Sequence, residues 1–570
     1  MKTSTKKTIF IFYMIFIVGA CLSFIFSNVS YDCEYQMAMA YRMIKGDRMI
    51  LEMWEPHQTS AFLCTLFMKI YMMITGTTTG IVLYMQVVGL CIRGGIAALF
   101  YKEIKELCGK MPALIVGITY LLISPKELLT PEFGNMQLWF GTLLFFAFLK
   151  YYKTEKKIFL VLGAVSLCLG VFSYPSFILV SIAVIIILVR FSKEWKKDLA
   201  LFVGVCLLIG GSFVAYILCS VGWDTCIKCI EMALAVEPSH TVGPVEKIWG
   251  FVVNIGQIAG MLAAVGAIGF LIELVTAFIC SLKNKAKLKL SGNRWFMISW
   301  LVLMCFFLLN ILSVSYRGGY AFPFILILGL GFIHRKRLSE SEKRIYDTAF
   351  WISGFSLIAT LILSDNAFLQ AITYMLVLIC VSMVPIFYWF RELSESKMLR
   401  RMFLTGMHIF FILIIFRCIY IHIPMHGVSQ IISPMQPMSI IRSGPAIGII
   451  TDSYAVTRNR DSLAEWAEIV EPGDKIWLVA EPVNTLGYLY EDVEVAAPTV
   501  MSTPTFNESL LYYWELNPDK YPEIIMVSSC YGELESKMQK NEWLITWLEE
   551  EYCADQVIDG HYWRYYIKKR

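Results

Sequence analysis

Charged residues are scarce in this chain. Only 16% of its 570 residues are Asp, Glu, Lys or Arg, whereas 57% are hydrophobic and the mean hydropathy is +0.61. This composition lies far outside the range of soluble domains. The apolar residues also fall into runs of about 14 to 25, and a helix needs about 20 to cross the hydrocarbon core of a bilayer. The sequence therefore predicts a polytopic, all-helical membrane domain.

Cations are few in the last part of the chain. Residues 423–570 hold 11 Lys/Arg against 22 Asp/Glu, whereas residues 1–422 hold 38 against 23. An acidic tail argues against nucleic acid as a partner, because the phosphate backbone is bound by Lys and Arg. Within the tail, strand-like runs at 475–480 and 523–528 alternate with helical stretches. We predict two domains, a transmembrane domain over 1–422 and a soluble α/β domain over 423–570.

The positive charges between apolar runs decide the topology. Counting all fourteen runs as spans would place every basic cluster on the outer side, against the positive-inside rule. If the short run at 59–76, which contains Lys69, does not cross the membrane, the basic clusters all lie on the cytoplasmic side. We therefore interpret 59–76 as a helix in the outer membrane interface. About thirteen transmembrane helices remain, with the N-terminus cytoplasmic and the C-terminal domain extracytoplasmic. They are expected at 9–26, 80–101, 111–124, 136–150, 158–172, 176–190, 198–220, 248–279, 295–315, 321–333, 347–363, 368–390 and 402–422.

Two acids, Asp32 and Glu34, follow the first span. Apolar residues after Asp32 recur at helical spacing and the stretch ends at Gly46, which indicates an amphipathic helix lying flat on the membrane. An ionisable group beside the bilayer usually marks function. Asp is also a favoured N-cap, so a structural role for Asp32 stays open.

Further candidates stand at the ends of later spans. Glu55 and His57 precede the interfacial helix, and the second outer loop contributes Lys126, Glu127 and Glu132. Two arginines are also candidates. Arg317 lies in a late outer loop and is either a snorkelling anchor or a phosphate clamp, whereas Arg93 lies deep in the second span and needs a partner. The Cys226–Cys229 pair lacks the second pair that a zinc site would want.

This layout resembles the GT-C superfamily of membrane glycosyltransferases, in particular the bacterial branch related to protein mannosyltransferases and lipid A aminoarabinose transferases. The landmarks are an acid after span one, a flat helix ending in glycine, an acid-Pro sequence before an interfacial helix, and an acidic second outer loop. The resemblance implies a catalytic role for Asp32, with Glu34 adjacent, and aligns Glu55 and Glu132 with two further family acids, Glu127 being the rival of Glu132. The family arginine near the start of span two has its nearest counterparts in Gln86 and Arg93.

The resemblance implies transfer of a sugar from a polyprenyl-phosphate donor to a glycan, lipid or protein acceptor at the outer face, with inversion. One carboxylate would take the acceptor proton, and cations from His57, Arg93, Lys126 and Arg317 would stabilise the leaving phosphate. No ATP site is expected. A divalent metal (Mg or Mn) held by Asp32 and Glu132 is implied for some relatives, but two carboxylates do not define such a site.

Two other functions stay open. A lipid or glycan transporter or flippase often shows internal repeats, and no duplication is visible between the halves. A polymerase or ligase of surface polysaccharide usually carries a large late outer loop, and the largest internal outer loop here, 220–247, is modest. Acids clustered near one face favour the transferase.

Overall fold

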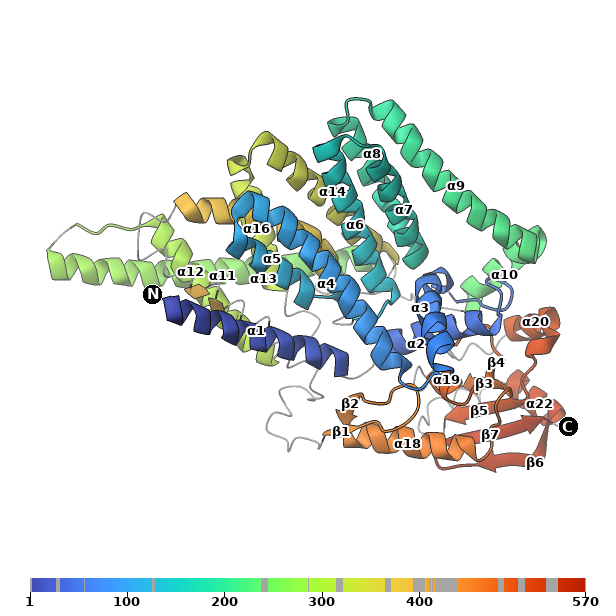
Figure 1. Ribbon diagram of the computed structural model, residues 1–570. Helices are drawn as coiled ribbons and strands as arrows, with labels where there is room; N and C mark the ends of the chain where they lie inside the picture. Colours follow the sequence, from blue (N-terminus) through green and yellow to red (C-terminus); the bar gives the residue numbers. More distant parts are fainter. Residues whose placement is uncertain are drawn as a thin grey trace.

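Figure 1 shows the computed structural model of the chain, a helical bundle with a mixed α/β domain at one end. It describes all residues except 1–2, 27–30, 56, 126–128, 237–243, 286, 314–320, 364–370, 393–404, 407, 410–411, 413–414, 416–437, 480–485, 501–507, 529–541 and 569–570.

The helices of the bundle follow one another with short connections. Their bounds are α1 (Thr3–Phe26), α2 (Tyr31–Lys45), η1 (Gln58–Ser60), α3 (Ala61–Thr75), α4 (Ile81–Cys108), α5 (Lys110–Leu122), α6 (Phe133–Thr154), α7 (Ile158–Ser173), η3 (Pro175–Leu179), α8 (Val180–Phe191), α9 (Trp195–Val221), α10 (Trp223–Val236), α11 (Pro244–Asn284), α12 (Gly292–Ser313), α13 (Ala321–His334), η5 (Arg335–Arg337), α14 (Glu340–Leu363), η6 (Ile372–Met375) and α16 (Leu376–Glu392).

Long apolar helices make this a helical membrane protein. Five segments in the described part of the chain are long and apolar enough to cross a bilayer: α4, α9, most of α11, α14, and η6 with α16. A helix lies on every predicted span up to 368–390, whereas the last, 402–422, lies largely outside the described residues. The total of thirteen spans stays a prediction.

Basic residues gather at one end of the bundle, as alternating helix directions require. Lys150 near the end of α6 pairs with Glu103 of α4, with Nζ 2.5 Å from Oε1. Lys157, which precedes α7, pairs with Asp198 of α9 at the same distance. The opposite end carries α2, α3 and the candidate acids.

The C-terminal domain is built on a five-stranded sheet in the order β4-β3-β5-β7-β6. β3 pairs in parallel with β4 and β5, while β7 pairs antiparallel with β5 and β6. A separate hairpin joins β1 and β2. The bounds are β1 (Met438–Ile440), β2 (Ile450–Asp452), α18 (Ser453–Ala467), β3 (Lys475–Val479), α19 (Gly487–Tyr490), β4 (Glu494–Val495), α20 (Glu508–Leu516), η9 (Pro518–Lys520), β5 (Ile524–Ser528), α22 (Glu542–Glu551), β6 (Tyr552–Asp559) and β7 (Trp563–Lys568).

The predicted strands at 475–480 and 523–528 coincide with β3 and β5, and an α/β arrangement is therefore confirmed for this part of the chain. Both strands are apolar apart from Lys475 and Ser528 at their ends, as expected for central parallel strands that are covered on both faces. Ile476 stands opposite Ile524 in the ladder, and both are buried. Trp466, Trp477 and Trp514 complete the core beside them.

The first outer loop lies between the bundle and the C-terminal domain (Figure 1). Helix α2 ends at Lys45 as predicted, and Gly46 follows with φ +108°, which a residue with a side chain rarely adopts. An amphipathic helix lying flat on the membrane would expose its polar face, however, and the central part of α2 does not. Residues 35–42 are all buried, including Arg42, because the C-terminal domain covers the face that was expected to meet water.

Helix α3 behaves differently from α2. Its Ala61, Cys64 and Met68 are buried, whereas Phe62, Leu66 and Met73 on the other side are exposed. One apolar face therefore packs inward and a second apolar face points away from the protein. This pattern fits the predicted helix in the membrane interface.

Candidate active site

The candidate acids that follow α1 and α5 lie at the end of the bundle that faces the C-terminal domain. Asp32 and Glu34 lie in the first turn of α2 and are half-buried. Cys33, between them, places its Sγ 2.6 Å from the Oγ1 of Thr130. Because Thr130 is two residues before Glu132, this contact brings the start of α2 against the start of α6.

Glu132 is fully buried and is the N-cap of α6. Its carboxylate accepts hydrogen bonds from the backbone N–H of Gly134 at 2.8 Å and of Asn135 at 2.5 Å. The positive end of the helix dipole adds to these bonds in favouring the charged carboxylate. The cap explains how an acid is tolerated in this buried position.

Asp32 and Glu34 point in different directions. Residues two apart on a helix do not share a face, so the two carboxylates cannot act together on one atom. The charge of Asp32 is close enough to act electrostatically on the Tyr374 hydroxyl, as is that of Glu132. Asp32 and Glu132 therefore both lie in the neighbourhood of the Tyr374 side chain. Helix α2 begins at Tyr31, which places Asp32 inside its first turn.

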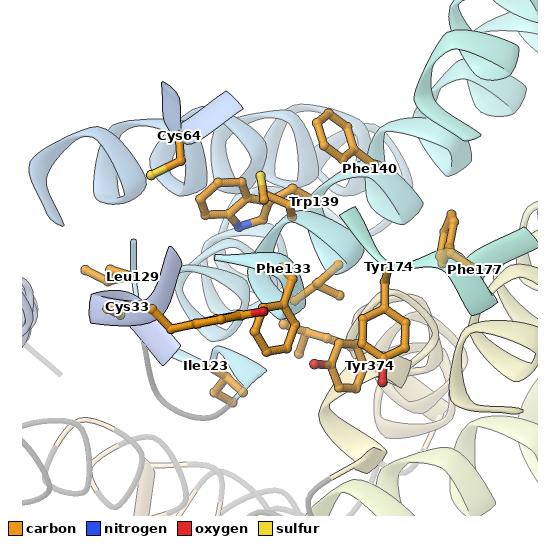
Figure 2. Packing of buried hydrophobic residues seen from close by; sticks show 14 of the residues in the cluster. Cys33, Cys64, Ile123, Leu129, Phe133, Trp139, Phe140, Tyr174, Phe177 and Tyr374 are labelled. Carbon is orange, nitrogen blue, oxygen red and sulfur yellow. The ribbon is translucent and has the colours of Figure 1, made fainter. Parts of the chain in front are cut away.

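Tyr374 of η6 completes this group and was missed in the sequence. It is buried, and its hydroxyl lies directly over Gly134: a Cβ at Gly134 would stand 2.5 Å from Tyr374 Oη and 3.0 Å from Glu132 Oε1. Figure 2 shows Tyr374 next to Tyr174 and Phe133. Its place at the start of a predicted span, where tyrosines commonly sit, was the available sequence signal.

Three nearly parallel rings form one wall of the site. The His57 ring lies 4.3 Å from that of Phe133 and 5.2 Å from that of Tyr174, at interplanar angles of 9° and 20°. The Phe133 and Tyr174 centroids are 6.1 Å apart. Stacking on Phe133 and Tyr174 therefore holds the His57 ring near the candidate acids, at the N-terminal end of α6.

Glu55 is directed away from this group, into the contact with the C-terminal domain. It is fully buried, accepts a hydrogen bond from the backbone N–H of Val500, and lies 3.7 Å from a terminal nitrogen of Arg42. Burial raises the pKa of Glu55 to about 7, although Arg42 and the Val500 N–H act in the opposite direction. Its predicted catalytic role stays untested, and its partners are those of an interface.

Arg93 has protein partners within the bundle. Its Nε and one terminal nitrogen donate to the backbone oxygens of Leu121 and Tyr120, both at 2.8 Å, and its guanidinium lies 5.5 Å from the Tyr120 ring centroid. These contacts hold the C-terminal end of α5. The remaining phosphate candidates Lys126 and Arg317, and the rival acid Glu127, lie outside the described residues.

The described donor set does not fit a metal centre. In the described ranges there is no group of three or more His, Cys, Asp or Glu side chains arranged to hold a metal ion. Both oxygens of Glu132 already accept backbone hydrogen bonds. Asp32 and Glu132 alone do not define a metal site, and a divalent metal there stays untested.

The comparisons with known proteins add one distant likeness. No family model and no curated protein matches the chain. Among solved structures, the chain is similar to the archaeal oligosaccharyltransferase AglB from Archaeoglobus fulgidus in complex with an inhibitory peptide and a dolichol-phosphate, with a TM-score of 0.42 and 10% identity over 95% of this chain and 72% of that chain. A likeness at this level does not identify a shared family or activity.

Proposed function

We propose that this protein is an inverting glycosyltransferase that moves a sugar from a polyprenyl-phosphate-linked donor to a cell-envelope acceptor at the outer face of the membrane. The observation that carries the proposal is the contact of two helix starts, α2 and α6, at Cys33 and Thr130, which places Asp32 and Glu132 at the same end of the bundle near Tyr374. A fully buried acid, Glu132, with a second, half-buried acid near it at the end of a transmembrane bundle is costly and therefore favours a functional role.

The proposed reaction divides the work between the residues of this group. Asp32, which is only half-buried, takes the proton of the acceptor hydroxyl as that oxygen bonds to the anomeric carbon. The bond from this carbon to the phosphate oxygen breaks, and the phosphate leaves as an anion that needs no proton. Glu132, held by its N-cap bonds, orients the acceptor or the sugar hydroxyls. Glu34 lies on another side of α2, so we assign it a smaller role in the reaction than Asp32.

The leaving phosphate needs positive charge nearby. His57 is the described candidate beside the acids, and Lys126 and Arg317 stay candidates from their sequence positions. Arg93 is less suited, because its guanidinium is engaged with the end of α5. Membrane lipids surround the bundle, and the polyprenyl chain of the donor would lie among them.

The test compares Asp32→Asn with Asp32→Ala in full-length protein in lipid nanodiscs, supplied with a panel of polyprenyl-phosphate hexoses. Release of polyprenyl phosphate and thermal stability are both measured. Asn retains the shape of Asp without its charge, so Asp32→Asn is expected to fold normally and lose about 10²–10⁴ in turnover. Asp224→Asn is the matched control, because Asp224 also lies in the first turn of a helix, α10, and is exposed.

The alternatives give different results. If the wild type moves labelled lipid or glycan between leaflets without cleaving the donor, the transporter is supported and the transferase is wrong. If it lengthens a glycan that stays on its lipid carrier, the polymerase is supported. If Asp32→Asn is as active as the wild type and only Asp32→Ala is impaired, Asp32 is a structural residue of α2 and the assigned base is wrong.

A further inference from the structure

A buried chain of charges joins the first outer loop to the C-terminal domain. Lys520 Nζ of the C-terminal domain lies 2.7 Å from Asp47, and Asp47 lies 2.6 Å from the Nε of Arg42. Arg42 in turn approaches Glu55 at 3.7 Å. All four side chains are buried or nearly so, with exposed fractions of 12% for Lys520 and 4% or less for the others. We call this group, together with Tyr513, the Arg42 clamp.

The clamp also binds backbone from both sides. Arg42 donates to the carbonyl oxygen of Glu52 in the loop and, at 3.4 Å, to that of Pro498 in the C-terminal domain. The Tyr513 hydroxyl, from α20, donates to the same Glu52 oxygen at 2.9 Å. A single guanidinium therefore bridges two segments that are more than 400 residues apart in the chain.

Neighbouring hydrogen bonds add to this attachment, in the loop and at the start of α4. The Trp54 N–H donates to the Pro498 oxygen at 2.8 Å, and the Asn517 amide donates to the Leu51 oxygen at 3.0 Å. At the start of α4, the Val82 N–H donates to the Pro445 oxygen at 3.1 Å. The loop backbone is thus attached to the C-terminal domain at Leu51, Glu52 and Trp54, while its other backbone bonds, such as that from Ile50 to Met53, run within the loop.

The clamp is connected to the candidate site through the chain itself. Arg42 belongs to the same helix as Asp32, ten residues and about 15 Å along α2. Glu55 is two residues before His57, whose ring is stacked on Phe133 and Tyr174. A displacement of the clamp would therefore move two groups of the site, one through a rigid helix and one through a two-residue connection.

We propose that the C-terminal domain sets the geometry of the catalytic loop through the Arg42 clamp, and that Arg42 and Glu55 are positioning residues for Asp32 and His57. The inference rests on the proposed function for its kinetic part alone. Burying two ion pairs costs more free energy than packing apolar residues of the same size. What the contacts supply is a fixed register, because the planar fork of Arg42 binds the Asp47 carboxylate and two carbonyl oxygens at once, with Glu55 3.7 Å away.

The experiment uses full-length protein in nanodiscs and variants on both sides of the contact. Arg42→Lys keeps the charge but removes the fork, and Arg48→Lys is its matched control in the same loop, since Arg48 is half-exposed and paired with Glu52 at the surface. Tyr513→Phe removes one hydroxyl on the domain side. Its control is Tyr512→Phe, the neighbouring tyrosine, whose ring packs against Lys228. Hydrogen exchange of residues 46–60 and the kcat and KM of transfer from a polyprenyl-phosphate hexose are measured for each.

We expect Arg42→Lys to speed amide exchange in residues 46–60 and to lower kcat by about tenfold to a hundredfold, with little change in the KM for the donor. Tyr513→Phe should act in the same direction by about threefold, although it lies in a different domain from the site. Both controls should stay within about twofold of the wild type. If Arg42→Lys does not fold, the amide exchange and kcat of Tyr513→Phe alone decide whether the proposal holds.

Two results would overturn the proposal that the Arg42 clamp positions the loop. One is amide exchange at the wild-type rate in both Arg42→Lys and Tyr513→Phe, and the other is faster amide exchange with an unchanged kcat. A wild type that transfers no sugar from any donor would instead refute the proposed function. In that case the exchange measurement still decides whether the C-terminal domain holds the loop, so the two failures are distinguishable.

Discussion

The hydroxyl of Tyr374 occupies the space that a side chain at Gly134 would need, since a Cβ there would stand 2.5 Å from Tyr374 Oη. Tyr374 comes from η6 and Gly134 from the first turn of α6. The contact ties the α14–α16 connection to the helix that Glu132 caps. Absence of a side chain at Gly134 is thus what allows a third element to reach the two acids.

The first prediction uses this contact. Gly134→Ala is expected to displace the Tyr374 hydroxyl and lower transfer by at least about tenfold, even though alanine by itself favours a helix by about 1 kcal/mol. Tyr374→Phe removes the clashing oxygen, so the double variant should be more stable than the sum of the single effects, with a coupling of about 0.5–3 kcal/mol. Thermal midpoints in detergent and transfer rates measure both. Additive effects of the two substitutions on stability would show that the Tyr374 ring moves aside without cost.

The second prediction separates two properties of Glu132. Glu132→Gln retains an oxygen that can accept an N–H from Gly134 or Asn135, whereas Glu132→Ala retains none. The alanine variant should lose about 0.5–2 kcal/mol of stability through the missing cap. The glutamine variant should lose less stability but most of its activity, if the charge of Glu132 takes part in the reaction. A fully active glutamine variant would assign Glu132 to structure only.

Much of the architecture could be predicted because it depends on local patterns. Apolar runs gave the helices, Gly46 marked the end of α2, and continuous apolar residues gave β3 and β5. The meeting of the two outer-loop acids was also predictable in outline, since alternation of spans brings odd-numbered loops to one end. The alternation needs only charge counts, which the sequence supplies directly.

The docking of the C-terminal domain left no such signal. It depends on backbone hydrogen bonds such as that from Trp54 to Pro498, and a backbone group has no sequence signature. The burial of Arg42 could not be foreseen for this reason, since an arginine on a polar helix face usually meets water. Tyr374 was missed for a related reason, because it reaches the site from about 240 residues beyond Gly134 and its approach depends on a missing side chain.

The third prediction concerns Arg93. Because its guanidinium satisfies the backbone oxygens of Tyr120 and Leu121, Arg93→Met should leave two buried carbonyls without donors and cost about 1–3 kcal/mol for each. The expected result is a lower thermal midpoint with an unchanged KM for the donor in the protein that remains folded. A raised KM at normal stability would make Arg93 a phosphate ligand instead. Arg190→Met, at the other end of the bundle, is the control.

The last prediction follows from the raised pKa of Glu55. Arg42 and hydrogen bonds from Val500, Thr499 and Tyr35 lower the pKa of Glu55, and burial outweighs them to bring it to about 7. An ordinary glutamate has a pKa of about 4.3, so between roughly pH 4.3 and 7 the folded protein holds a proton that the unfolded chain has released. The stability contributed by this group is therefore present at low pH and is lost as the pH rises through 7.

Glu55→Gln removes this dependence, because glutamine does not titrate. The thermal midpoint of the variant, minus that of the wild type, should rise from pH 5 to pH 7 and level off above about pH 8. Glu52→Gln, three residues earlier and only half-buried, is the matched control measured over the same range. A difference that is constant with pH, or that falls as the pH rises, would mean that Arg42 holds Glu55 charged throughout. The clamp would then be a permanent ion pair instead of one that forms as the pH approaches neutrality.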